Sequence, residues 1–410
     1  MIRWAIFIGV FVLIDFYAYQ AVRTTFRSKG VNITYIIISL AVLANFIYQI
    51  QTSDRSLGIS TKINLAIGLF LTLYIPKILI MVIMFGEDII RLPQACYKFF
   101  TEGNAAEGSY LPSRRMFISQ IALGLAAIPF ASFLYGMVKG KYNFKVLNYT
   151  LHFDDLPEAF DGYKITHISD IHSGSFDNKE KVEYAVDLVN EQESNIILFT
   201  GDLVNNTAKE MIPWQDTFKR LKAEDGIFSI FGNHDYGDYV QWNSEEDKKQ
   251  NLEDLKTIQK GLGFNLLLNE SRFIKKKDQR IAIVGVENWG RGFKQKGDLK
   301  KAAIHIEKDD FKILLSHDPT HWQERVIDNE YHYHLTLSGH THGMQFGIEI
   351  PGFIKWSPVK WRYKYWAGIY KEKGQYINVN RGLGYLAFPG RVGIWPEITV
   401  IELKKGSNSV

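Results

Sequence analysis

The chain has 410 residues, a formal net charge of +4 and a single cysteine, Cys96. This length allows two folding units, while the lone cysteine excludes an internal disulfide framework and a zinc site built from several thiolates. The charge does not indicate a nucleic-acid footprint, which would need basic residues massed on one face, so no nucleic-acid partner is expected.

The first third of the chain contains four apolar stretches, each close to the roughly 20 residues that a membrane-spanning helix needs. They cover about Trp4–Val22, Val31–Ile50, Ile63–Phe85 and Met116–Met137. The alternative, buried helices of a large soluble domain, fits less well because the stretches are too long and too apolar for ordinary amphipathic helices. We therefore expect a membrane region of about four transmembrane helices in residues 1–140, followed by a catalytic domain in residues 141–410.

Two charged residues interrupt these stretches: Asp15 lies in the first, and Lys77, directly after Pro76, lies in the third. A lone charge in hydrocarbon costs roughly 3 kcal/mol on insertion scales. Under the four-helix arrangement both residues lie somewhat past mid-depth on helices that run the same way. This placement predicts an Asp15–Lys77 pair inside the bundle, with a proton or ion path as the less favoured alternative.

Lysine and arginine residues in the short loops predict the orientation, because cytoplasmic loops are enriched in them. In loop order they are Arg23, Arg27 and Lys29; then Arg55 and Lys62; then Arg91, Lys98, Arg114 and Arg115. The modest excess in the first and third loops places both chain ends outside. Arg114 and Arg115, directly before the fourth stretch, resemble a twin-arginine export signal or form a simple positive-inside anchor. Both interpretations predict a multi-pass protein of the bacterial inner membrane with an extracytoplasmic catalytic domain.

From about Lys141 onward, short apolar strands alternate with polar helical segments, which is typical of an α/β domain. The expected strands are Tyr163–Ile168, Ile196–Thr200, Ile227–Phe231, Ile281–Val286, Ile313–Leu315 and Leu335–Leu337, and the expected helices lie near Lys179–Glu191, Trp214–Lys222 and Glu245–Gly261. Almost every expected strand ends in polar residues that can bind metals, where open α/β sheets form their sites.

Five clusters of Asp, Asn and His follow these strands. They are Asp170-Ile171-His172, Gly201-Asp202-Leu203-Val204-Asn205, Gly232-Asn233-His234-Asp235, His317-Asp318 and Gly339-His340-Thr341-His342-Gly343. Asp and His two apart on an extended chain project to the same side, and a carboxylate with two oxygens could bridge two ions. Each cluster alone is a weak signal, but together they predict a metal site. Mixed imidazole, carboxylate and amide ligands favour Mn, Fe or Zn over Ca or Mg.

The ordered motifs Asp-x-His, Gly-Asp-x-x-Asn, Gly-Asn-His-Asp, a later His and Gly-His-x-His resemble those of the calcineurin-like metallophosphoesterase superfamily, over roughly Lys145 to Leu403. The later segments Asn380–Gly384 and Pro396–Ile398 are similar to a bacterial membrane-anchored branch of it. The resemblance implies an α/β/β/α sandwich. It also implies hydrolysis of a phosphodiester, phosphomonoester or pyrophosphate bond by a hydroxide that bridges two divalent metal ions, with no phosphoenzyme.

The resemblance further implies a role for each motif residue. The implied metal ligands are Asp170, His172 and His342 for the first ion, Asn233, His317 and His340 for the second, and Asp202 as the bridge between them.

The implied catalytic residues are His234, beside the scissile phosphate, and Asp235, which would orient it. Two positions depart from the family pattern. Asn205 stands where Asp is common, which puts its supporting role in doubt, and Met344 stands where many relatives have glycine, so that substrate access can differ.

The segments Phe353–Trp356 and Lys360–Trp366 interleave cations with aromatic residues. This composition favours the membrane–water interface, and a hairpin or loop packed over the active site fits equally well; nucleic-acid stacking fits less well. The remaining histidines are expected to be surface or packing residues: His152, His167, His305, His321, His332 and His334.

These features predict a membrane-anchored, metal-dependent phosphoesterase whose phosphate-containing substrate could be lipid-linked. Two alternatives stay open. One is a phosphoesterase for soluble nucleotides that the membrane region merely tethers, and the other is a non-catalytic membrane sensor or scaffold that keeps the fold.

Overall fold

The computed structural model of the chain describes residues 2–54, 58, 60–102 and 112–407. It divides into two compact units, Met1–Ser53 with Ser60–Met137 and Asp54–Ile59 with Val138–Val410. Arg55, one of the two cationic residues of the expected second loop, lies outside the described residues.

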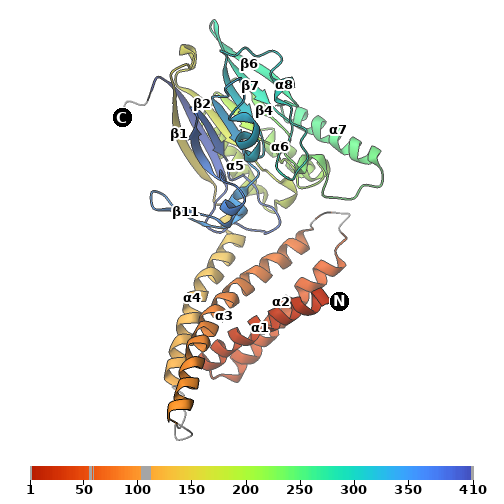
Figure 1. Cartoon of the computed structure of the whole chain (residues 1–410). Helices are drawn as coiled ribbons and strands as arrows, with labels where there is room; N and C mark the ends of the chain where they lie inside the picture. The colour runs from red at the N-terminus through yellow and green to blue at the C-terminus, as the bar shows by residue number, and fades with distance from the viewer. Residues whose placement is uncertain (1, 55–57, 59, 103–111, 408–410) are drawn as a thin grey trace. The chain divides into compact units, whose positions relative to one another are not determined.

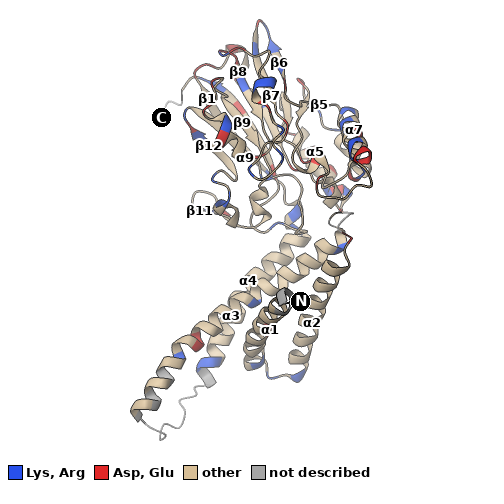
Figure 2. Cartoon of the chain, turned by 45° about the vertical axis from the view of Figure 1, so that its right-hand side comes forward, with Lys and Arg blue, Asp and Glu red and all other residues tan. Residues whose placement is uncertain are grey.

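The first unit consists of long apolar helices: α1 (Ile2–Thr25), α2 (Lys29–Thr52), α3 (Thr61–Glu102) and α4 (Pro112–Val138). All four are long and apolar enough to cross a membrane, as expected, and charged residues are sparse along them (Figure 2). Helix α3 runs well past the predicted end at Phe85. The continuation carries Glu87, Asp88 and Arg91, so the apolar stretch ends there although the helix does not.

The charged residues inside these helices form the predicted pair. Lys77 Nζ lies 2.5 Å from Asp15 Oδ1 and 2.8 Å from Ser39 Oγ. The Tyr74 hydroxyl donates to the other oxygen of Asp15 at 2.7 Å, and the ammonium of Lys77 lies 4.4 Å from the centre of the Tyr74 ring. Because the partners come from α1, α2 and α3, the pair joins three helices in apolar surroundings.

A second ionic cluster joins α3 to α4. Arg115 forms ion pairs with Glu87 and, at 2.9 Å, with Asp88, and Arg114 lies 3.8 Å from Glu87. The two arginines that resemble an export signal are therefore helical residues with acidic partners.

The second unit contains two six-stranded mixed sheets with the orders β1-β14-β2-β3-β4-β5 and β12-β13-β9-β8-β7-β6. The first comprises β1 (Lys145–Phe153), β14 (Glu397–Lys405), β2 (Tyr163–Ile168), β3 (Ile196–Phe199), β4 (Ile227–Ser229) and β5 (Phe264–Leu266). The second comprises β12 (Gly368–Glu372), β13 (Gln375–Val379), β9 (Leu335–Ser338), β8 (Phe311–Leu315), β7 (Gln279–Gly285) and β6 (Glu270–Lys276). A separate hairpin pairs β10 (Ile348–Ile350) with β11 (Ile354–Trp356).

The two sheets pack face to face and helices cover both outer faces, as Figure 1 shows. Buried side chains of both sheets, such as Leu198 and Ile313, form the central core. Another core lies between the first sheet and α5 (Lys179–Asn190), α6 (Gln215–Phe218) and α7 (Glu245–Gly261). The second sheet is covered by α8 (Leu299–Ala302) and by α9 (Pro319–His321) with the helical turn that follows it. This arrangement confirms the expected α/β/β/α sandwich.

All six predicted strands are present, but the other strands were not predicted, among them β1 and β14. Strand β1 mixes exposed, partly buried and buried residues instead of showing an apolar run, and it pairs in parallel with β14 from the far end of the chain. Strands β2, β3 and β4 are parallel to one another, as are β7, β8, β9 and β13. The motif loops therefore leave the carboxyl ends of parallel strands in both sheets, where they can meet.

We expect the Asp15–Lys77 pair to be needed for stability of the helical unit. Asp15→Lys or Lys77→Asp alone leaves two like charges in hydrocarbon, at a cost of roughly 3 kcal/mol for each unpaired charge, and should lower the yield and the melting temperature in detergent. The double swap should restore both properties. The same swap of the exposed Glu253 and the partly exposed Lys256 is the control and should change neither property, because such surface pairs contribute little. A double swap no more stable than either single variant would contradict the pairing.

Candidate metal centre

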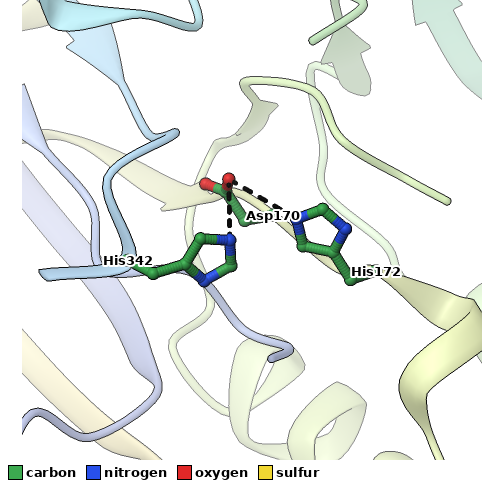
Figure 3. Close-up of side chains that lie close together, drawn as sticks. All are labelled: Asp170, His172 and His342. Carbon is green, nitrogen blue, oxygen red and sulfur yellow. Dashed lines mark ion pairs between the residues drawn. The ribbon is translucent and has the colours of Figure 1, made fainter. Parts of the chain in front are cut away.

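The first group of donor side chains combines the loop after β2 with the loop after β9. Asp170 Oδ1 lies 3.9 Å from His172 Nε2 and 3.3 Å from His342 Nε2, and the three side chains point toward one another (Figure 3). Their donor atoms all lie within 4.8 Å of one another, so the group could hold one metal ion. All three residues are buried.

The second group combines loops from both sheets. Asp202, His317 and His340 also place donor atoms within 4.8 Å of one another. His340 Nδ1 lies 3.3 Å from His317 Nε2 and 2.8 Å from the amide oxygen of Asn233. Asn233 therefore offers a fourth donor beside this group.

Asp202 lies between the two groups. Its Oδ2 atom is 3.6 Å from His172 Nε2 in the first group and 3.1 Å from His317 Nε2 in the second. The structure thus brings all seven predicted ligands together, although they come from five separate loops. A carboxylate in this position can contact two neighbouring ions.

Neighbouring groups orient these donors. His317 donates from Nδ1 to the carbonyl oxygen of Thr200 at 2.8 Å, which leaves its Nε2 atom facing Asp202. Asn233 donates from its amide nitrogen to the Tyr239 hydroxyl at 2.8 Å, which turns its oxygen toward His340. Such supporting contacts fix the tautomer and direction of metal ligands.

The backbone is unusual at the same residues. Five of the seven have a positive φ angle, which side chains other than glycine rarely adopt: Asp170 (48°), His172 (47°), Asp202 (59°), His340 (70°) and His342 (50°). Each costs about 1–3 kcal/mol, and such strain clusters at functional sites. The protein therefore holds these side chains in place at the expense of stability.

Several buried polar atoms in this region fit a bound cation. His172 is fully buried, and neither of its ring nitrogens has a hydrogen-bond partner among the described residues; the same holds for His342 Nε2. A buried polar group without a partner costs about 1–3 kcal/mol. A divalent ion would satisfy one nitrogen of each ring, and imidazole with carboxylate is a common donor set for Zn, Fe and Mn.

The electrostatic balance agrees with this interpretation. Burial opposes ionisation of Asp170, but His342 and the other nearby imidazoles outweigh burial and hold its pKa well below the usual value. Burial also disfavours the charged form of His317, yet Asp202 and Asp170 raise its pKa to about 10. The two carboxylates thus favour positive charge beside His317 Nε2, which a metal ion would also supply.

The predicted catalytic pair is arranged differently from the expectation. His234 donates from Nδ1 to the backbone carbonyl of Asn205 at 2.7 Å, so Asn205 orients the ring. The hydrogen bonds of Asp235 go to backbone amides of the neighbouring loops. Its two oxygens accept from the backbone amides of Asp202 and Gly232, both at 2.8 Å, and of Leu203. Burial and the nearby Asp202 raise the pKa of Asp235 to about 7. Asp235 therefore joins the loop of Asp202 to its own loop.

The two departures from the family pattern have different consequences. Asn205 supports His234 through its backbone carbonyl, which any residue can supply, and its amide contacts Ser175 at 2.9 Å. Met344 has a φ angle of 55° and an exposed side chain, so the position that favours glycine carries an apolar group next to the loop of His342.

Two supporting residues were not predicted as part of the site. The Tyr363 hydroxyl lies 2.9 Å from His340 Nε2. Arg391 is fully buried, donates to the backbone oxygens of Arg381 at 2.8 Å and of Gly384, and lies 3.2 Å from His342 Nδ1. No motif marks these residues, since Tyr363 belongs to the aromatic segment and Arg391 stands alone in the sequence.

Of the other histidines, three are buried packing residues with polar partners, as expected. His167 contacts Thr200, His321 contacts Ser316, and His334 contacts Asp155.

Comparisons with known proteins agree with this geometry. Residues 163–344 match the family model of the calcineurin-like phosphoesterases. Residues 2–141 match a model described as a probable calcineurin-like phosphoesterase, transmembrane domain.

The chain is also similar to individual curated proteins. It is 29% identical to the uncharacterized metallophosphoesterase YkuE of Bacillus subtilis over 302 residues, 71% of this chain and 98% of the relative. It is 26% identical to a transmembrane protein with metallophosphoesterase domain of Danio rerio, over 66% of this chain and 60% of the relative. An uncharacterized metallophosphoesterase of Helicobacter pylori is 28% identical over 72% of this chain and 73% of its own length.

Gly339 should be required for metal binding. A side-chain carbon at this position would lie 1.9 Å from Ser169 Oγ and 2.2 Å from Asp170 Oδ2, so Gly339→Ala must displace a predicted ligand. We expect metal affinity to fall by about 10- to 100-fold, the range for residues that orient ligands. Metal content after dialysis, measured by mass spectrometry, tests this prediction.

Gly261→Ala is the matched control, because no atom lies within 4 Å of the added carbon. Equal metal content in the two variants, with both folded by circular dichroism, would contradict the proposed role of the Gly339 loop.

Proposed function

We propose that this chain, which belongs to the calcineurin-like metallophosphoesterase superfamily and carries its four-helix transmembrane domain, hydrolyses a phosphodiester, phosphomonoester or pyrophosphate bond. The observation that carries the proposal is the position of Asp202 between two groups of donor side chains. Two-metal hydrolases use such a bridged pair of ions.

The proposed ligand set follows from the two groups. Asp170, His172 and His342 would hold one ion, Asn233, His317 and His340 would hold the other, and Asp202 would contact both. The donor set supports Mn, Fe or Zn.

A pair of divalent ions held by these residues would acidify a water molecule and neutralise phosphoryl oxygens. The protein itself would orient the imidazole of His234. Its Nδ1 atom donates to the Asn205 carbonyl, and its ring centre lies 4.9 Å from that of His172. In the protonated imidazole, Nε2 also carries a hydrogen, and it would then stabilise negative charge on the phosphoryl group or donate that proton to the leaving oxygen.

The membrane region supports a location in the bacterial inner membrane, with residues 141–410 as an extracytoplasmic catalytic domain and residues 1–140 as the anchor. The bias of lysine and arginine among the helix ends supports this orientation. A substrate that is lipid-linked fits a catalytic domain kept at a bilayer. Tethered hydrolysis of soluble nucleotides is the second possibility, and competition by nucleotides but not by lipid phosphates would favour it.

A non-catalytic scaffold is the remaining alternative, and a simple assay separates it from an enzyme. Purified full-length protein should hydrolyse bis(p-nitrophenyl) phosphate when Mn²⁺ is added. Chelation should abolish the activity, and renewed addition of the metal should restore it. No hydrolysis with Mn²⁺, Fe²⁺ or Zn²⁺ would contradict the enzymatic function.

His234→Ala should lower turnover of the same compound by about 10²- to 10⁴-fold, the usual contribution of a general acid or base. Its metal content should stay at the level of the unmodified protein, because His234 is not in the ligand set. Loss of the metal in this variant would show that His234 is a structural ligand instead.

A further inference from the structure

The β10–β11 hairpin has its apolar side facing outward. Ile348 lies opposite Trp356 and Ile350 lies opposite Ile354, so these four side chains share one face of the two-stranded ribbon. Ile348 is 51% exposed and Ile350 is 52% exposed. Phe353, at the tip, is 86% exposed.

The charged residues occupy the other face, where the partly buried Glu349 and the exposed Lys355 each contact the domain. Glu349 and Lys355 lie opposite each other in the register. Glu349 accepts a hydrogen bond from Arg381 at 2.6 Å. Lys355 donates to the carbonyl of Ala367, and its ammonium lies 5.2 Å from the centre of the Trp366 ring. A hairpin surrounded by water places its apolar residues inward, so this reversed pattern indicates an apolar partner on the outer face.

The chain after the hairpin extends the same surface. Trp361 is 75% exposed, and its ring packs edge-on against Trp356 at 6.1 Å. Lys360 and Arg362, on either side of it, are also exposed. Trp366, the other tryptophan of this aromatic segment, is only 5% exposed and packs in a small core. The outward face therefore consists of Ile348, Ile350, Phe353, Ile354, Trp356 and Trp361, and we call it the hairpin face.

The hairpin face adjoins the metal centre. The chain enters β10 directly after the loop of His342, and Ser357 donates to the carbonyl of Gly343 at 2.8 Å where the chain returns. Tyr363, just beyond Trp361, contacts His340. Both ends of the hairpin segment are thus fixed to residues of the Gly-His-Thr-His-Gly loop.

We propose that the hairpin face docks on the polar–apolar interface of a lipid bilayer, and that the substrate reaches the metal centre with its phosphate at the membrane surface. The position of the substrate phosphate at the membrane surface rests on the proposed function, whereas docking of the hairpin face does not.

The composition of the chain favours a bilayer as the occupant. Four membrane-spanning helices of the same chain hold the domain at a membrane. Tryptophan is enriched at headgroup depth, and exposed cations such as Lys360 and Arg362 suit anionic lipid phosphates. A second copy of the chain would present the same cations to one another, which disfavours a symmetric contact through this face.

A fluorescent probe on the full-length chain tests the docking. Cys96 is replaced by serine, since it is the only cysteine, and Phe353→Cys is labelled with an environment-sensitive nitrobenzoxadiazole dye. The protein is reconstituted in vesicles of brominated phosphatidylcholine with phosphatidylglycerol. Brominated acyl chains quench only a probe that reaches the apolar region.

Ile304→Cys is the matched control, because Ile304 is also an exposed apolar residue, at 68%. It follows α8, which lies at the opposite end of the catalytic domain from β11 (Figure 1). Should Phe353→Cys not fold, Ile350→Cys reports on the same face. Hydrolysis of bis(p-nitrophenyl) phosphate by the unlabelled chain in detergent reports on the proposed function separately.

The proposal predicts a blue-shifted probe at position 353 that brominated lipid quenches several-fold more than the probe at position 304. Equal quenching at the two positions would overturn it. A probe at position 353 that is quenched by aqueous iodide but not by brominated lipid would also overturn it. So would a probe at 353 that neither quencher reaches, which is the result expected if a second copy of the chain covered this face.

Discussion

Negative charge between two cations lowers their mutual repulsion, and in this protein the Asp202 carboxylate lies between the two groups of donor side chains. Its side chain is 3.1 Å from His317 and 3.6 Å from His172, which belong to different groups of donors. The backbone amide of His234 donates to its other oxygen at 2.8 Å. Asp235 in turn holds the amide of Asp202 itself. The rest of the site is arranged around this buried carboxylate.

Holding that arrangement lowers the stability of the metal-free protein. The ligand loops contain left-handed residues such as Asp170 and His342, and the buried ring of His172 has no hydrogen-bond partner among the described residues. The central core between the two sheets offsets these terms. Because ions would bind the folded chain and not the unfolded one, they would also stabilise the domain by mass action. Backbone strain would therefore lower the free energy of unfolding of the domain, while the buried core and bound ions would raise it.

Features of the fold and the site that depend on local sequence pattern were predictable from the sequence, whereas features that depend on contacts between distant residues were not. Strands such as β3 appear in the sequence as apolar runs, and motifs at their carboxyl ends mark the candidate ligands. In contrast, His234 is supported by the backbone carbonyl of Asn205, and this contact cannot be predicted from the type of residue at position 205. The contact of Tyr363 with His340 depends on the return of the hairpin segment to the site. The reversed hairpin face likewise appears only once the register of β10 and β11 is known.

Low-temperature electron paramagnetic resonance of the full-length protein loaded with Mn²⁺ can show whether two ions lie on either side of Asp202. Ions that share one carboxylate are about 3.5–4 Å apart and couple magnetically. A site in which Asp202 lies between two ions predicts two Mn²⁺ per chain and the multiline spectrum of an exchange-coupled pair, which Asp202→Ala should abolish. A spectrum of isolated Mn²⁺ ions in the saturated, unmodified protein would contradict it.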